Sequence, residues 1–206
     1  MGTQGIVVPF LEYGEIGGRA DEIIDKHHPS RELPIPVEEI IDPGMGISIF
    51  PLPGLTRATE DDDGIVAYIN SALDTITVDD SAYKRQSPRY RFSIAHELGH
   101  IVMHQAIFPL LRFDTVAEWK RVQTEIPQRE YRWLDWQAHA FAGHLLVPTT
   151  ELQAALSEYL AVAEAQGIDP RDDSVRLFAE KYLGDTFRAS AMVLHIRIEK
   201  EDLWPV

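Results

Sequence analysis

Cysteine is absent from the 206-residue chain. This absence excludes disulfide bonds and thiolate metal sites, so a bound metal ion would have to be held by histidine, aspartate or glutamate. No run of 18 apolar residues occurs, and the N-terminal residues lack the basic and apolar regions of a signal peptide. We therefore expect a cytoplasmic protein that is neither exported nor inserted in a membrane.

Positive charge is also scarce. The chain carries 19 Lys and Arg residues against 33 Asp and Glu residues, which gives a formal net charge of -14. A field of this sign repels phosphate backbones and anionic lipid surfaces. We therefore expect no direct contact with nucleic acid or with a membrane, whereas a basic protein partner would be attracted.

The order of the predicted elements indicates an α+β fold. Strand patterns occupy residues 47–50, 64–69 and 75–79, between a short helical N-terminal region and a long helical C-terminal region. Three short strands predict a small, mainly antiparallel sheet. Segregation of sheet and helices is typical of α+β domains and differs from the alternation of βαβ units.

The helix predicted after Ser87 has a clear N-terminal signal. Ser87 suits the N-cap and Pro88 the first helical position, so a helix is predicted to run from there to about His104. Further helices are expected over residues 18–28, 37–41, 116–124, 129–147, 150–166, 174–183 and 186–200. We interpret residues 1–206 as one domain, with a helical N-terminal segment (1–45), a core (46–148) and a helical C-terminal part (149–206).

This helix carries the run His96-Glu97-Leu98-Gly99-His100. Residues four apart share a helix face, so His96 and His100 can aim imidazole nitrogens at one zinc ion about 2 Å from each. Glu97 lies beside the first histidine, where its carboxylate can take a proton from the water that attacks a carbonyl group. Glycine at position 99 leaves the ligand face uncrowded. The run therefore predicts a zinc peptidase site.

A catalytic zinc site needs a third protein ligand and keeps a fourth position open. The best source is the predicted helix over residues 129–147, where Asp135 and His139 are four apart and share a face. Alanine and other apolar residues between them suit close packing against a second helix. Spacing alone does not decide which of the two side chains binds the metal.

Two longer motifs give the sequence a family resemblance. Residues 91–104 read R-F-S-I-A-H-E-L-G-H-I-V-M-H, and residues 135–148 read D-W-Q-A-H-A-F-A-G-H-L-L-V-P. Together they closely resemble the ImmA/IrrE family of metallopeptidases, whose second motif begins E-x-x-A-[NDH]-x-F-A. The resemblance implies a zincin-like domain in which the sheet packs against the active-site helix.

The resemblance also implies roles for individual residues. His96, His100 and Asp135 match the zinc ligands and Glu97 the general base, with His139 as the rival third ligand. The family usually has glutamate where Asp135 stands, and with the shorter aspartate either the second helix lies closer or the site binds zinc more weakly. The implied activity is site-specific cleavage of a helix-turn-helix transcriptional repressor, which here would be a separate chain. The alternative is a catalytically weak regulator of the same fold that acts by binding a partner.

The remaining histidines have simpler explanations. His104 lies eight residues from His96, about 12 Å along a helix, so it cannot share the same ion and is expected to support the site or pack in the core. His144 is likewise expected to support the site or to be a satisfied core histidine, His195 to be a packing residue, and the His27-His28 pair to be solvated. Tryptophans at positions 119, 133 and 136 are interpreted as core or helix-contact residues.

Overall fold

A computed structural model describes residues 5–58 and 64–205. In these ranges the N-terminal region contains helix α1 (Tyr13–His27), the short helix α2 (Val37–Glu39) and the π-helical turn η2 (Ile40–Gly44). The central region contains β1 (Ser48–Leu52), α3 (Leu55–Ala58), β2 (Ala67–Ile69), β3 (Thr75–Asp79), α4 (Asp80–Arg85), α5 (Pro88–Met103), α6 (Phe108–Leu111), α7 (Val116–Glu125) and α8 (Gln128–Leu146). Helices α9 (Thr149–Ala165), α10 (Asp173–Phe187) and α11 (Ala191–Lys200) complete the chain. The α+β fold is confirmed.

The small sheet is mixed, with strand order β1-β3-β2. Strand β2 pairs antiparallel with β3, whereas β1 pairs parallel with β3 in a register that joins Ser48 to Thr75 and Leu52 to Asp79. The expectation of a mainly antiparallel sheet is therefore wrong for β1. The tight turn between β2 and β3 fixes their antiparallel pairing, and β3 then runs in the same direction as β1 on its other side.

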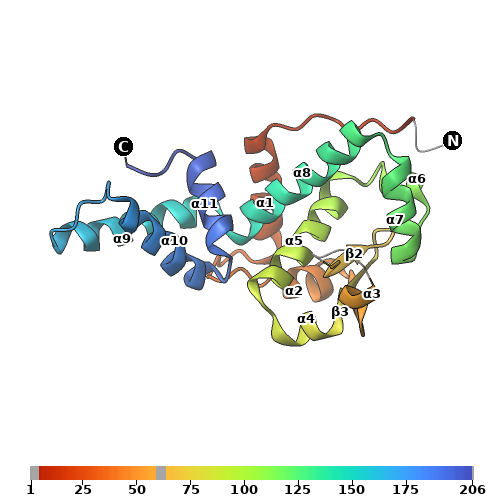
Figure 1. Cartoon of the computed structure of the whole chain (residues 1–206), viewed down its shortest axis with the longest axis horizontal. Coiled ribbons are helices and arrows are strands. Elements are labelled where there is room, and N and C mark those ends of the chain that lie inside the picture. Colours follow the sequence, from red (N-terminus) through yellow and green to blue (C-terminus); the bar gives the residue numbers. More distant parts are fainter. Residues whose placement is uncertain (1–4, 59–63, 206) are drawn as a thin grey trace.

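Helix α5 begins as predicted. The Ser87 side chain accepts a hydrogen bond from the backbone N–H of Tyr90, and Pro88 occupies the first turn. Its buried face includes Ile94, Leu98 and Ile101, which are 0%, 0% and 5% exposed. This face packs on the sheet and on α8, and Figure 1 shows α5 enclosed between α8, α1 and the strands.

Gly99 lies where α5 and α8 approach each other closely. A Cβ atom on this residue would lie 3.1 Å from Cα and 3.2 Å from O of Ala138, and 3.2 Å from Cβ of Phe141. The expectation that this glycine leaves the ligand face uncrowded is wrong, because its hydrogen faces the neighbouring helix. The small residue instead brings the two helices that carry the candidate ligands close together.

The C-terminal helices form an arm beside the core (Figure 1). The single helix predicted over residues 186–200 is wrong, since α10 extends to Phe187 and α11 begins at Ala191 with the Ser190 side chain as its N-cap. Arg188, with φ at 49°, ends α10 in the left-handed region. Within the described ranges, no helix is both long enough and apolar enough to cross a membrane.

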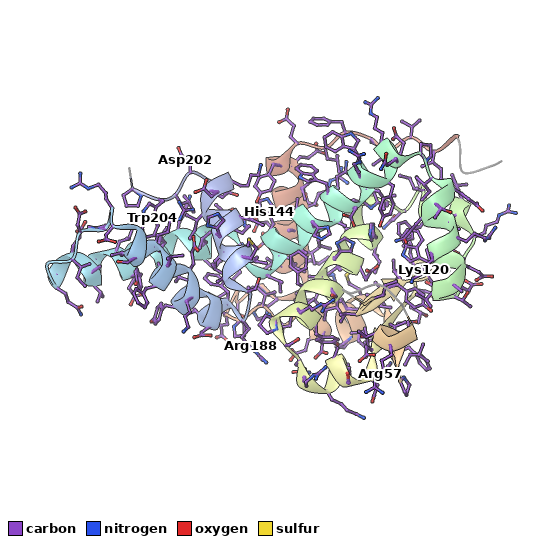
Figure 2. All side chains as sticks on the ribbon, viewed as in Figure 1. Arg57, Lys120, His144, Arg188, Asp202 and Trp204 are labelled. Atoms are coloured by element: carbon purple, nitrogen blue, oxygen red, sulfur yellow. The ribbon has the colours of Figure 1, made fainter. Side chains whose placement is uncertain are left out.

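Buried Arg197 ties this arm to the core. Its guanidinium donates to the Val147 carbonyl at 3.0 Å, to the Tyr13 hydroxyl at 2.7 Å and to Glu201 at 2.7 Å. These contacts join α11 to α1 and to the end of α8. His144, labelled at this junction in Figure 2, lies 5% exposed against the same guanidinium, so of the two expected roles it has that of a satisfied core histidine.

Candidate metal centre

Helix α5 holds the first two ligand candidates one turn apart. The Nε2 atoms of His96 and His100 face each other at 3.0 Å. In a tetrahedral zinc site with bonds of about 2.1 Å, two ligand nitrogens lie about 3.4 Å apart. Burial lowers the pKa of His96 to about 3 and holds the pKa of His100 well below its usual range. Both rings are therefore neutral, as metal binding requires, and spaced closely enough to share one ion.

Hydrogen bonds behind His100 determine which of its nitrogens carries the proton. Gln137 donates from Nε2 to the Pro9 carbonyl at 2.7 Å, which leaves its Oε1 to accept from His104 Nε2 at 3.0 Å. Neutral His104, whose pKa burial lowers to about 4, then accepts the Nδ1–H of His100 at 2.9 Å. His100 consequently carries its lone pair on Nε2, the atom that faces His96. His104 thus has the supporting position expected of it.

Glu97 is buried between α5 and the edge of the sheet. Its Oε2 atom accepts a hydrogen bond of 2.9 Å from the backbone N–H of Ile69, the last residue of β2. Burial raises the pKa of Glu97 to about 8, against the lowering effect of this bond. The hydrogen bond from β2 holds the carboxyl group in place within the same cavity as His96 and His100. No sequence pattern indicated the contact, because it joins residues 28 positions apart on different elements.

Helix α8 brings Asp135 and His139 to the same point. Oδ1 of Asp135 lies 3.8 Å from Nε2 of His96, and Nδ1 of His139 lies 3.4 Å from Oδ2 of Asp135. Ligand atoms of these three residues all lie within 4.8 Å of one another. Nδ1 of His139 is also 2.9 Å from the backbone carbonyl oxygen of Asp135, within its own helix. Both sequence candidates for the third ligand therefore reach the cluster.

The charges of Asp135 and His139 stabilise each other. Burial acts to raise the pKa of Asp135, but the hydrogen bond and charge of His139 outweigh burial and lower it. Burial likewise acts to lower the pKa of His139, but its hydrogen bond to Asp135 and the aspartate charge raise it. Asp135 is consequently held in its anionic form, in which a carboxylate oxygen can bind a metal ion.

These donors fit a zinc ion. Two neutral imidazoles and a carboxylate form a ligand set typical of catalytic zinc, which leaves one position for water or substrate. The 3.8 Å separation shows that the short Asp135 side chain comes close to His96, the first of the two histidines, because Gly99 allows α8 to approach α5. Asp135 as the third ligand, in preference to His139, stays a prediction.

A cavity of about 150 Å³ opens in front of the cluster. Trp119 and Gln123 of α7 and Tyr131 of α8 line it together with Glu97 and the candidate ligands. Gln123 donates to the Tyr131 hydroxyl at 3.0 Å, and burial raises the pKa of Tyr131 to about 12, so the phenol keeps its proton. Tyr131 was not among the residues predicted from the sequence to form the site. Its position one turn before Asp135 on the same helix was the available signal.

Other residues singled out in the sequence lie outside the cluster. Trp119 is buried, as expected, whereas Trp133 and Trp136 are half-buried and line surface hollows. His195 is 46% exposed and pairs with Glu180 at 2.8 Å, so its interpretation as a packing residue is wrong. The reason is that the His195 side chain on α11 faces α10, where it pairs with the buried carboxylate of Glu180.

Comparison with protein families agrees with this geometry. Residues 82–199, more than half of the chain, match the peptidase family described as IrrE N-terminal-like domain. The matched region contains α5 and α8 and hence all candidate site residues on these helices. A search of curated proteins finds no match.

Proposed function

Because this chain belongs to the IrrE N-terminal-like peptidase family, we propose that it is a zinc-dependent endopeptidase. The observation that supports this most is the pairing of the His96 and His100 Nε2 atoms at 3.0 Å, with the Asp135 carboxylate 3.8 Å from His96 and Glu97 in the same cavity. The proposed enzyme is cytoplasmic, an expectation that rests on the sequence.

His96, His100 and Asp135 would hold the ion. Bound zinc supplies Lewis acidity, which polarises a peptide carbonyl and makes a water molecule more acidic. Glu97, fixed by the Ile69 N–H, accepts the proton of the attacking water and delivers it to the departing amine. Buried His104 keeps the correct nitrogen of His100 available throughout.

The proposed substrate is a separately encoded helix-turn-helix repressor. This part of the proposal comes from the resemblance to the ImmA/IrrE family. The net charge of -14 supports it, since repressors that bind DNA carry basic surfaces.

A regulator of the same fold, acting by partner binding alone, is the alternative. It would hold metal poorly because aspartate is one methylene shorter than glutamate. The approach of Asp135 to His96 at 3.8 Å favours the enzyme. Buried Glu97 also favours the enzyme. Burial of a carboxyl group costs stability, and such groups cluster at functional sites. Zinc content after equimolar loading distinguishes the two functions, because the enzyme should retain zinc and the regulator should lose it.

Replacement of Glu97 by glutamine tests the proposal. The amide oxygen can still accept the Ile69 hydrogen bond, but it cannot take a proton from water. We expect zinc content and unfolding midpoint to be kept, and kcat/KM to fall by at least about 100-fold. The substrates are peptides that the zinc-loaded wild type cleaves from a proteome-derived library, identified by mass spectrometry.

Glu22→Gln on the exposed face of α1 is the matched control and should keep full activity. Turnover retained in fully zinc-loaded Glu97→Gln would contradict the general-base role. A zinc-loaded wild type that cleaves nothing in the library would favour the regulator.

A further inference from the structure

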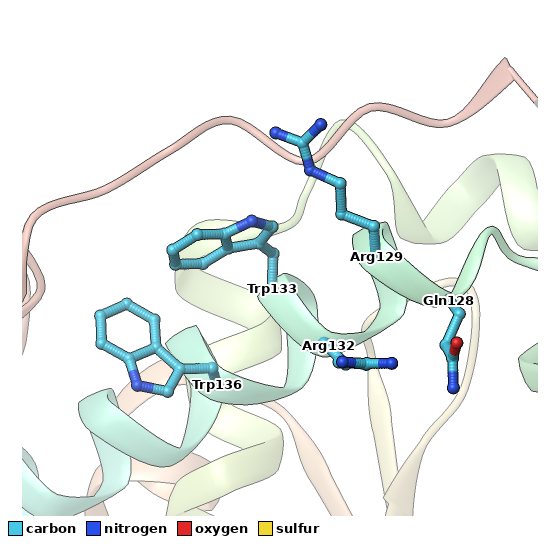
Figure 3. Close-up of a pocket in the computed structure, with 5 residues that line it drawn as sticks. All are labelled: Gln128, Arg129, Arg132, Trp133 and Trp136. Carbon is cyan, nitrogen blue, oxygen red and sulfur yellow. The ribbon is translucent and has the colours of Figure 1, made fainter.

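One face of α8 carries a stripe of arginine and tryptophan. Four side chains follow at spacings of three and four residues, namely Arg129, Arg132, Trp133 and Trp136. Figure 3 shows both indoles and both guanidinium groups projecting from this helix, where they line a hollow of about 590 Å³. The indoles meet edge to face with centroids 5.4 Å apart. The stripe thus presents aromatic surface and positive charge together.

A second hollow, of about 530 Å³, adjoins the first at Trp136, which lines both. It lies between α5, α8 and α11. We call the two together the α8 groove, from Arg129 and Trp133 through Trp136 and His139 to Ile196 and Lys200. Within it, the His139 ring lies 4.5 Å from the His96 ring. His139, one of the candidate ligands, therefore joins the groove to His96 of the candidate metal centre.

The floor of the groove near α11 is apolar. Met192 and Ile196 of this helix are 65% and 46% exposed, and Phe92 of α5 faces them across the hollow. Exposed apolar side chains that gather in one hollow are a common mark of a binding surface. The occupant should therefore supply apolar side chains of its own.

Among the residues that the structure describes, every charged side chain that lines the groove is basic, although the whole chain carries a net charge of -14. These residues are Arg89, Arg129, Arg132, Arg197 and Lys200. Arg197 is paired with Glu201 at 2.7 Å. Arg129 and Arg132 are exposed and form no ion pair with any residue in the ranges 5–58 and 64–205. Their charge is available to an acidic partner.

We propose that the α8 groove binds the substrate segment next to the cleaved bond, and that this segment combines acidic with apolar residues. The proposal rests on the proposed peptidase function. Arginine and tryptophan are the residue types most enriched at energetically important interface positions. The acidic surface as a whole attracts a basic protein at long range, whereas the groove selects a locally acidic, apolar stretch of it.

A single-stranded nucleic acid is the chief competitor, because aromatic stacking and arginine also serve its binding. The net charge of -14 opposes it. Continuity with a peptidase site likewise favours a polypeptide.

The test uses the full-length Glu97→Gln protein, with and without zinc. A phage library of random 12-residue peptides is selected on it, and enriched peptides are synthesised with a fluorescent label for anisotropy titrations. Arg129→Glu/Arg132→Glu reverses the charge of the groove. Lys26→Glu/Lys181→Glu, at exposed lysines of α1 and α10, changes the charge equally elsewhere.

We expect acidic and apolar peptides to be enriched, to bind the groove variant at least tenfold more weakly, and to bind the control variant as before. Enrichment of basic peptides, no enrichment, or equal weakening in the control would overturn the proposal. The proposal would also be overturned if a labelled deoxythymidine 12-mer binds better than the peptides. It would likewise fail if the wild type and the control variant form a dimer and the groove variant does not. A wild type that binds these peptides but cleaves none when zinc-loaded would refute the peptidase function and leave the groove as a docking surface.

Discussion

Substitution of Gly99 by alanine should loosen the contact that brings the candidate ligands together. The added Cβ would lie 3.1 to 3.2 Å from its three nearest neighbours, whereas ordinary contacts begin at 3.4 Å. Two of these neighbours are backbone atoms of Ala138, so α5 and α8 must separate by a few tenths of an ångström. Overpacking of this kind costs about 1–3 kcal/mol, and alanine recovers about 1 kcal/mol of helix propensity. The expected net loss is about 1 kcal/mol.

Gly18→Ala is the matched control. Gly18 also lies inside a helix, but no atom lies within 4 Å of its added Cβ. This substitution should therefore stabilise the protein by about 0.5–1 kcal/mol. Urea unfolding of the metal-free proteins measures both values, and zinc affinity should fall only for Gly99→Ala. Equal stabilisation by the two substitutions would refute the claim that close helix approach requires glycine at position 99.

Two further predictions concern buried polar groups. Gln137→Leu removes the acceptor that fixes the His104 proton and should weaken zinc binding by about 10- to 100-fold. Gln137→Glu should bind zinc nearly as well as wild type, because burial keeps its carboxyl group protonated, so that its O–H can donate to the Pro9 carbonyl while its other oxygen accepts from His104. Equal zinc affinity in these two variants would contradict the role of the hydrogen-bond chain. Burial acts to raise the pKa of Asp79, but hydrogen bonds from Ser81, Thr56 and Ala82 outweigh it and lower the pKa to about 2. The stability from this lowered pKa is fully present above about pH 4 and is lost as pH falls toward 2, a loss of about 2 kcal/mol. Asp79→Asn should remove this loss from acid unfolding curves, and an unchanged pH dependence would show that the carboxylate contributes nothing.

Local signals predicted much of the fold. Ser87 and Pro88 mark the start of α5 because capping depends on neighbouring residues alone. The parallel pairing of β1 with β3 was missed because strand order depends on contacts between distant segments. The split between α10 and α11 was missed because Arg188 adopts a left-handed conformation that glycine more often marks.

The candidate site was predictable where helix periodicity sets it. His96 and His100 meet because they are one turn apart on α5, and Asp135 was placed by its motif. Ile69 and Gln137 could not be foreseen, since their contacts with the site depend on how β2 and α8 pack against α5. The basic groove on α8 could not be predicted from the net charge, because that number sums over the whole chain and does not show where basic residues gather.

The identity of the third ligand is the most direct test of the metal centre. Zinc affinity, measured by competition with a chromophoric chelator, should be lost in Asp135→Ala, kept in Asp135→Glu and reduced less than tenfold in His139→Asn. This order follows if the Asp135 oxygen, 3.8 Å from His96 Nε2, completes a site of two histidines and one carboxylate. Tight zinc binding by Asp135→Ala, together with its loss in His139→Asn, would contradict the account.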